Sequence, residues 1–171
     1  MKAIITRGIS ASGKTTFAKT LIDQGWMDIN RDWIRFNIVA PSSDWSTYRF
    51  TNKREREVTE IQTQMIMDAY SKEQDIIISD TNLDDNRLAT LKAFLEDLDI
   101  DVEVKLFPIT LEEAYRRDAA RANGVGQNVI YKQYLKWLDI VGRQRYTPDT
   151  TQPKAVIFDV DGTLAEMAGG R

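Results

Sequence analysis

The segment that most constrains the fold is 8–15, with the sequence Gly-Ile-Ser-Ala-Ser-Gly-Lys-Thr. Two glycines, a lysine and a hydroxyl residue stand at the spacing of a phosphate-binding P-loop. An apolar run over 3–5 precedes the segment, and an amphipathic run that begins at Thr16 follows it. This order of strand, glycine turn and helix start directs backbone N–H groups and the positive end of a helix dipole at an anion. The motif predicts a nucleoside triphosphate site rather than a glycine turn with a lysine nearby by chance.

The residue types of this motif assign a task to each position. Lys14 is expected to reach the outer phosphates, and the Thr15 hydroxyl is expected to bind the Mg²⁺ that accompanies them. The loop and the first helical turn are expected to surround the phosphates through Gly8, Ser10, Ala11, Ser12, Gly13, Lys14, Thr15 and Thr16. A P-loop alone does not separate a kinase from an ATPase, a GTPase or a motor, so other residues must decide the reaction.

The composition excludes several kinds of chemistry. The chain of 171 residues has no cysteine and no histidine. Disulfides, thiolate metal sites and cysteine nucleophiles are therefore ruled out, and proton transfer near neutral pH falls to a carboxylate. The formal net charge of −3 argues against bulk attraction of long nucleic acid, although a few local arginines would suffice to bind a strand end. Without a membrane-length apolar run or room for a signal peptide, we expect a cytoplasmic protein of about one domain.

Strands and helices are expected to alternate along the chain. Strands are predicted at 3–5, 27–29, 76–82 and 102–107, and helices from 16 to Gly25, from 30 onward, and at 53–70, 85–98, 111–122 and 127–141. The isoleucine run 76–78 is typical of a central parallel strand that is covered on both faces. Helical spacing puts Ile22 and Val141 among the buried positions. The alternation predicts an α/β fold of three layers, a parallel sheet with helices on both faces.

Asp32 is the candidate general base. It follows the second predicted strand, on the carboxyl side of the sheet, where ligands of open α/β sheets bind. In a chain without histidine it is the natural acceptor for a proton from an attacking hydroxyl. Arg35 lies three residues further on and would share its helix face. The alternative is that Asp32 only caps its helix, as aspartates often do.

Asp80 is the candidate magnesium residue. It ends an apolar strand in the manner of a Walker B segment, and such an aspartate holds Mg²⁺ directly or through water. The alternative is a turn residue at the end of a strand. Thr81 and Asn82 add hydrogen-bonding groups at the same mouth of the sheet.

A group of arginines, Arg116, Arg117 and Arg121, precedes a glycine-containing break at 123–126. Arg117 and Arg121 are four residues apart and would share a helix face. A mobile helix and loop of this kind would form a lid over the triphosphate and stabilise charge on the transferred phosphoryl group. The alternative is a solvated face paired with acidic residues of the same helix; we favour it for Arg116 and favour the lid role for Arg121.

A small basic and aromatic run follows the second helix. It consists of Trp45, Tyr48, Arg49, Phe50, Lys53, Arg54 and Arg56. Such a mixture can hold single-stranded nucleic acid by phosphate contact and base stacking. Equally, the charges can be solvated and the aromatic side chains part of the core, and the sequence leaves the two interpretations open.

Taken together, these motifs resemble the T-even phage polynucleotide kinase/3′-phosphatase family. The matching segments occur in the same order along the whole chain, at 8–15, 30–35, 79–82, the lid arginines and 153–165. The resemblance implies an adenylate-kinase-like P-loop domain that uses ATP and Mg²⁺ to phosphorylate the 5′-hydroxyl ends of DNA or RNA. In that family a haloacid-dehalogenase-type domain follows and removes 3′-phosphates, so that broken ends are healed before a ligase seals them.

The resemblance also implies roles for individual residues. Asp32 would activate the 5′-hydroxyl, Arg35 would bind the acceptor's 3′-side phosphate, and Thr81 would add another acceptor contact. Arg121 would contact the donor phosphates, with Arg117 in support. Two departures stand in the P-loop region: Ala11 replaces a glycine that is common in the family, and Arg7 adds a charge just before the loop.

The segment 153–171 resembles the start of the phosphatase domain. Asp159 stands in the position of the nucleophile and Asp161 in that of the acid/base. The later strands that carry a lysine and further magnesium carboxylates do not follow. We therefore expect a kinase domain at 1–152, a truncated phosphatase start at 153–171, and no 3′-phosphatase activity.

Two other functions remain open at this stage. One is a small-molecule kinase on the same fold, acting on a sugar, nucleoside or antibiotic hydroxyl. The other is a nucleotide-binding regulatory module without transfer activity. The sequence leaves undetermined the preference for DNA or RNA, the preference for single strands or recessed ends, and the oligomeric state.

Overall fold

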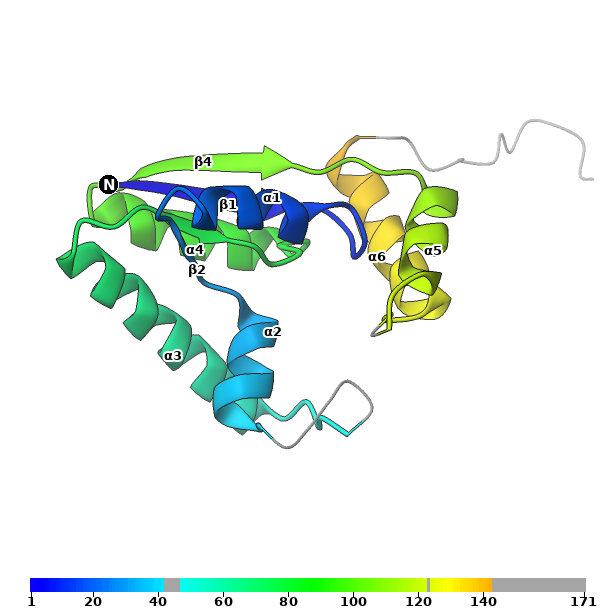
Figure 1. The fold of residues 1–171 in the computed structure, drawn as a ribbon, viewed down its shortest axis with the longest axis horizontal. Helices are drawn as coiled ribbons and strands as arrows, with labels where there is room; N and C mark the ends of the chain where they lie inside the picture. Colours follow the sequence, from blue (N-terminus) through cyan, green and yellow to red (C-terminus); the bar gives the residue numbers. More distant parts are fainter. Residues whose placement is uncertain (42–46, 123, 143–171) are drawn as a thin grey trace, which may run out of the picture.

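The computed structural model describes residues 1–41, 47–122 and 124–142, and its centre is a four-stranded parallel sheet. The strands run in the spatial order β2-β3-β1-β4 (Figure 1). Their bounds are β1 (Lys2–Arg7), β2 (Met27–Asp28), β3 (Ile76–Ile78) and β4 (Asp101–Leu106). All neighbouring strands are parallel, so their carboxyl ends lie at one edge of the sheet.

The helices occupy the connections between these strands and the region after β4. They are α1 (Lys14–Ile22), α2 (Arg31–Ile34), η1 (Arg35–Val39), α3 (Asn52–Ser71), α4 (Asp85–Asp97), α5 (Leu111–Ala119) and α6 (Gln127–Ile140). The segment η1 is a π-helical turn that continues α2 directly, and its closing bond runs from the Ala40 N–H to the Arg35 carbonyl at 2.9 Å. Within the described residues, no helix combines the length and the apolar character that crossing a membrane requires.

The isoleucines of β3 form the middle of the sheet, as predicted. Ile76 pairs with Ala3 of β1 on one side and with Met27 of β2 on the other. All three isoleucines are fully buried. Successive side chains of a strand point to opposite faces, and Ile76 and Ile78 accordingly join one hydrophobic cluster while Ile77 joins another.

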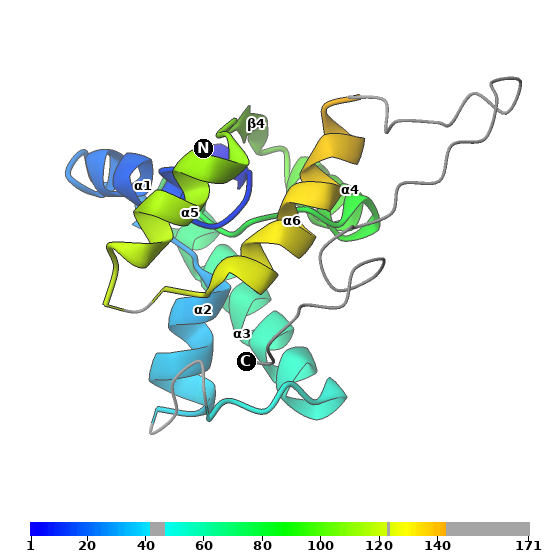
Figure 2. The same ribbon diagram turned by 90° about the vertical axis from the view of Figure 1, so that its right-hand side faces the viewer.

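The three-layer architecture predicted from the sequence is confirmed. On one face, Ile66 of α3 and Leu88 and Leu95 of α4 pack against Ile76 and Ile78. On the other face, Ala18 and Leu21 of α1 pack against Ile77. A third cluster joins α5 and α6 to the P-loop, through Ile9, Ala114, Ile130 and Trp137. Figures 1 and 2 show the α5–α6 pair beyond the carboxyl edge of the sheet, on the side where the P-loop turns.

Several local predictions were wrong. Ile22 and Val141 are exposed, at 45% and 38%, because each lies at the last turn of its helix, beyond the contact with its neighbours. The predicted helix 111–122 ends at Ala119, so Arg121 lies outside α5 and does not share a helix face with Arg117. The chain turns there because the Arg121 N–H donates to the Asp118 carbonyl at 3.0 Å. The predicted domain start at 153–171 lies outside the described residues.

Candidate active site

The P-loop connects β1 to α1 and has the backbone shape that an anion site requires. Ala11 and Gly13 both have positive φ, at 64° and 99°. No side chain caps the N-terminus of α1, so its first N–H groups remain directed at the loop. Gly8 is held by its N–H to the Thr81 carbonyl at 3.0 Å, and a Cβ at this position would lie 2.8 Å from the Phe107 carbonyl oxygen. The loop is therefore fixed between β3 and β4.

Lys14 points back into this loop. Its side chain is buried, and Nζ donates to the Ile9 carbonyl at 2.6 Å and to Ser12 Oγ at 3.3 Å. Burial and the nearby charge of Arg121 lower the pKa of Lys14 to about 8, while Asp80 and Asp32 act in the opposite direction. The lysine therefore lies within electrostatic reach of three residues that the sequence had assigned to the same site.

The start of α2 is determined by Asn30. Its side-chain oxygen accepts from the Trp33 N–H at 2.9 Å, which is an N-cap, and its Nδ2 donates to Ser79 Oγ at 2.9 Å, just after β3. The alternative interpretation of Asp32 as the helix cap is wrong, since Asn30 has that role. Because Asn30 anchors α2 to the end of β3, Asp32 lies at the carboxyl edge of the sheet.

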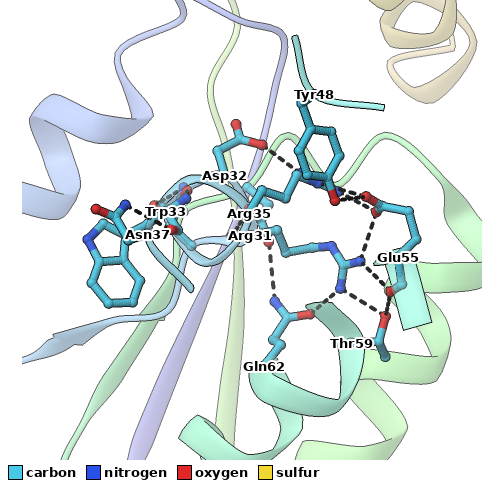
Figure 3. Close-up of polar contacts among 12 residues, drawn as sticks. Arg31, Asp32, Trp33, Arg35, Asn37, Tyr48, Glu55, Thr59 and Gln62 are labelled. Carbon is cyan, nitrogen blue, oxygen red and sulfur yellow. Dashed lines mark hydrogen bonds and ion pairs between the residues drawn. The ribbon is translucent and has the colours of Figure 1, made fainter. Parts of the chain in front are cut away.

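Asp32 and Arg35 form an ion pair, as their spacing predicted. Arg35 Nη1 donates to Asp32 Oδ1 at 2.6 Å. The other side of the guanidinium is held by Glu55 of α3, through Nε to Oε1 at 3.0 Å and Nη2 to Oε2 at 2.6 Å. Figure 3 shows Arg35 between the two carboxylates. A bidentate pair of this kind fixes the plane of the guanidinium, and with it the direction of the bond to Asp32.

The charge on Asp32 is set by opposing effects. Burial raises the pKa of Asp32, whereas Arg35, Lys14 and Arg31 favour its ionised form. The side chain is 47% exposed, and among the described residues Oδ2 has no hydrogen-bond partner. Asp32 thus combines an anchored oxygen with a second oxygen that can accept a proton from a ligand.

Asp80 is tied to α2 and α3 by both of its oxygens. Oδ1 accepts from the Arg31 N–H at 2.9 Å and Oδ2 accepts from Gln62 Nε2 at 3.2 Å. Burial, with the negative charge of Asp32 also contributing, raises the pKa of Asp80 to about 6. Gln62 also accepts from Arg31 Nη1 at 2.9 Å, and Arg31 Nη2 reaches Glu55 Oε2 at 3.2 Å. One polar network therefore connects the end of β3 to the Asp32–Arg35 pair. Figure 3 shows the part of it that joins Gln62, Arg31, Glu55, Arg35 and Asp32.

The two predicted magnesium residues fit that metal. Thr15 is exposed in the first turn of α1, and Asp80 is a carboxylate whose raised pKa shows that a nearby cation would stabilise its charge. Hydroxyl and carboxylate oxygens are ligands that Mg²⁺ accepts, usually together with water and substrate phosphates. Within the described residues no group of three or more acidic side chains forms a metal site.

The three arginines after β4 have different surroundings. Arg116 and Arg117 both pair with Glu113 of their own helix, each with a nearest distance of 2.7 Å, and Arg116 is 72% exposed. The solvated interpretation of Arg116 is confirmed. Arg121 is the arginine of this group whose charge acts on Lys14.

The connection from α5 to α6 is closed by a buried carboxylate. Asp118 is 4% exposed, and its Oδ1 and Oδ2 accept from the Val125 and Gly126 N–H groups at 3.1 and 2.8 Å. Gly124 passes so close that a Cβ there would lie 2.7 Å from the Asp118 carbonyl oxygen. Asp118 is one of the acidic residues of the predicted helix 111–122 that were expected to pair with the arginines on a solvated face, and for Asp118 that interpretation is wrong. It holds the loop that carries Arg121.

A pocket of about 370 Å³ opens at the carboxyl edge of the sheet, within the size range of small-ligand sites. It brings together four of the predicted residues, Asp32, Arg35, Asp80 and Thr81. Asn82, which the sequence placed beside Thr81 at the mouth of the sheet, also lines it. No site role was predicted from the sequence for the remaining lining residues, which are Arg31, Leu83, Asp84, Arg87, Val129, Lys132, Gln133 and Lys136.

The structure decides between the two interpretations for only part of the basic and aromatic run. Tyr48 is 5% exposed, and its hydroxyl donates to Glu55 Oε1 at 3.1 Å, so it belongs to the network around Arg35. Phe50 is 58% exposed, and its ring centroid lies 5.5 Å from Arg35 Cζ. Trp45 lies outside the described residues. A nucleic-acid contact at Phe50 stays a prediction.

The comparisons with known proteins agree with this geometry. Residues 4–139 match the family described as an AAA domain, and that match covers most of the chain. The chain belongs to the AAA domain family. Its parallel sheet, P-loop and flanking helices are those of P-loop kinases. A solved gluconokinase from Sinorhizobium meliloti 1021 has a similar fold, with a TM-score of 0.55 at 14% identity, over 79% of this chain and 74% of that one.

Two further proteins are similar to this chain. A protein of Autographa californica nuclear polyhedrosis virus, named for polynucleotide kinase and RNA ligase activities, is 28% identical over 95% of this chain and 24% of its own length. A chain in the Pnkp1/Rnl/Hen1 complex has a TM-score of 0.56 at 25% identity, over 68% of this chain and 38% of that one. The chain therefore spans well under half of each. The likeness is to polynucleotide kinases in general, and the narrower T-even phage type is a proposal.

Proposed function

We propose that this AAA-domain protein is an ATP-dependent kinase of polynucleotide 5′-hydroxyl ends, of the type found in T-even phages. The observation that carries the proposal is the Asp32–Arg35 pair. It places a carboxylate with one available oxygen in a pocket next to the P-loop lysine. The name of the viral relative, which includes polynucleotide kinase, supports a nucleic-acid acceptor. We assign the reaction to the cytoplasm, where ATP is supplied.

On the donor side, the P-loop and Lys14 would bind the β- and γ-phosphates of ATP. Thr15 and Asp80 would hold Mg²⁺, which neutralises charge on these phosphates when it is bound. The α1 N-terminus, which lacks a side-chain cap, adds backbone N–H groups. Arg121 would stabilise the charge that develops on the transferred group, with Arg117 leaving Glu113 to support it.

On the acceptor side, Asp32 would act as general base. The 5′-hydroxyl oxygen attacks the γ-phosphorus in line as the bond to the β-phosphate oxygen breaks. The hydroxyl proton passes to Asp32 Oδ2, and ADP leaves. Arg35 would bind the phosphate on the 3′ side of the acceptor nucleoside, and Thr81 lines the same pocket and would add a second contact.

A small-molecule hydroxyl kinase is the second candidate, because the fold is shared with a gluconokinase. At 14% identity, that likeness shows the fold and says nothing about the substrate. The deciding experiment offers labelled ATP to 5′-hydroxyl DNA and RNA oligonucleotides, to a nucleoside and to gluconate. We expect label on the oligonucleotides at a kcat/KM at least about a hundredfold above that of the other two, since only they fill the acceptor pocket. Label on gluconate or the nucleoside alone would overturn the proposal.

A further inference from the structure

The acceptor pocket is cationic in a chain that is acidic overall. Five of its lining side chains are basic and three are acidic, so its formal charge is positive although the whole chain carries −3. The three carboxylates all have partners inside the protein. Asp32 accepts from Arg35, Asp80 accepts from the Arg31 N–H, and Asp84 caps α4 by accepting from the Arg87 N–H at 2.9 Å.

The five basic side chains divide into two groups. The guanidiniums of Arg31 and Arg35 are buried and bound to Glu55, so the fold itself uses their charges, and the proposed phosphate contact of Arg35 comes in addition to that pairing. Arg87, Lys132 and Lys136 are exposed. Across residues 1–41, 47–122 and 124–142, these three side chains have no carboxylate within ion-pair distance and no hydrogen-bond acceptor. The fold does not need their charges, and a bound anion can use them.

The two lysines come from one face of α6. Val129, Lys132, Gln133 and Lys136 recur at three- and four-residue spacing and all line the pocket, next to the face that buries Ile130 and Trp137. Gln133 lies between the lysines and accepts from the Ser10 N–H of the P-loop at 2.7 Å. Its bond sets α6 against the donor loop. The lysines are therefore placed on the wall of the acceptor pocket that adjoins the phosphate-donor site.

Arg87 completes the basic surface from another element. It lies in the first turn of α4, and its charge lowers the pKa of Arg31, which puts the two guanidiniums within electrostatic reach. The pocket is thus lined by Asp32 and Arg35 from the α2 region and by the cations of α4 and α6. A ligand that satisfies Arg35 and also these three cations must carry several negative charges spaced along its length.

We propose that Arg87, Lys132 and Lys136 bind the phosphodiester backbone of a single-stranded acceptor, beyond the phosphate nearest the reacting end. This rests on the proposed function and names the residues that make the site select a polynucleotide strand over a mononucleotide or sugar. Phosphate groups of a single strand supply the series of anions that the three cations require, and each contact releases a counterion. The strand runs from Asp32 across the pocket toward α6 and α4.

The test compares two triple variants of equal net charge. Arg87→Ala with Lys132→Ala and Lys136→Ala removes the proposed contacts. Lys19→Ala with Lys72→Ala and Lys92→Ala removes three exposed cations outside the pocket. Binding of a fluorescein-labelled 5′-hydroxyl DNA 12-mer is followed by anisotropy without ATP, between 50 and 200 mM salt. Thermal unfolding checks that both variants are folded, and replacement of Lys132 and Lys136 by arginine keeps the charges.

We expect the pocket variant to bind the 12-mer on the order of 30-fold more weakly, and its log–log salt slope to fall by about two, at roughly 0.7 per lost contact. The control and the arginine variant should bind as the wild type does. Equal binding by the pocket variant and the wild type, or a wild type that does not bind the 12-mer, would overturn the proposal. Binding with these properties but without phosphate transfer would instead overturn the kinase assignment and leave the strand-binding surface standing.

Discussion

Arg35 donates to Asp32 Oδ1 at 2.6 Å while Glu55 holds the opposite side of its guanidinium at 2.6 and 3.0 Å. The candidate base is therefore positioned indirectly by Glu55, which lies twenty positions beyond Arg35 in a different helix. The arrangement also limits the rise in the pKa of Asp32, since Arg35 offsets the burial that raises it. The Glu55–Arg35 pair therefore fixes the direction from which Arg35 binds Asp32.

Replacing Glu55 tests this dependence. In Glu55→Gln the neutral amide leaves two buried arginines, Arg31 and Arg35, without their shared carboxylate. We expect the free energy of unfolding to fall by about 2–3 kcal/mol, in line with breaking a largely buried ion pair. The rate of phosphate transfer should fall at least about tenfold, because Arg35 no longer orients Asp32. Denaturant unfolding and kcat measure the two effects, and Glu57→Gln on the exposed side of α3 is the control.

The same pair predicts a pH dependence of stability. Arg35 is the main cause that lowers the pKa of Glu55 from 4.5 to about 2. A depressed carboxyl pKa contributes stability that is complete above pH 4.5 and is lost as the pH falls toward 2. The wild type should lose stability more steeply than Glu55→Gln across this interval. Parallel pH profiles for the two proteins would show that the Glu55 pair contributes nothing.

Lys14 predicts a pH dependence of ATP binding. Its pKa of about 8 in the free protein means that the ammonium is mostly neutral at pH 9, whereas bound phosphates would favour the charged form. ATP binding above pH 8 should take up a proton and weaken by about tenfold per pH unit. Calorimetry in buffers of different ionisation enthalpy measures both. In the Lys14→Arg control the side chain stays charged, so the Kd for ATP of any binding that the variant retains should not change with pH. A wild-type Kd for ATP that stays constant from about pH 7 to 9.5 would contradict the account.

The hydrogen bonds of Asp118 predict that the loop between α5 and α6 can be loosened by replacing a residue that has no proposed contact with the nucleotide. In Asp118→Asn one of the two acceptors for the Val125 and Gly126 N–H groups becomes a donor, and a buried N–H loses its partner. We expect about 1–3 kcal/mol less stability and a KM for ATP that rises on the order of tenfold, because the loop also carries Arg121. Thermal unfolding and steady-state kinetics are the measurements. The control Asp97→Asn, at an exposed site, should behave as the wild type. An unchanged KM for ATP in Asp118→Asn would show that the loop held by Asp118 takes no part in ATP binding.

Local patterns predicted most of the fold. The P-loop, the central β3 isoleucines and the helices around the sheet are set by spacing over short stretches, and all are found as expected. The misses lie where tertiary contacts decide. The π-helical turn η1 contains one extra residue per turn, and no periodic pattern in the sequence indicates it. The early end of α5 goes with the hydrogen bonds of the Asp118 carboxylate to the N–H groups of residues 125 and 126.

The candidate site was predicted in part for the same reason. Asp32 and Arg35 are neighbours on one helical segment, so spacing revealed the pair. Glu55 lies among basic residues in the sequence and was not predicted as a site residue. A signal was present, because Glu55, Thr59 and Gln62 recur at helical spacing as a polar stripe, which could have indicated a buried polar partner. The cations of α4 and α6 meet at the pocket only through the fold, and no local pattern joins them.

The central claim is that Asp32 accepts the proton of a polynucleotide 5′-hydroxyl. The most direct test is the single-turnover transfer of labelled γ-phosphate from ATP to a 5′-hydroxyl oligonucleotide by the wild type and by Asp32→Asn. The asparagine keeps an oxygen for Arg35 but cannot take the proton, so transfer should fall by a factor of about a hundred or more while the Kd for ATP changes less than about threefold. Transfer by Asp32→Asn at more than about a tenth of the wild-type rate would contradict the assignment of Asp32 as the base.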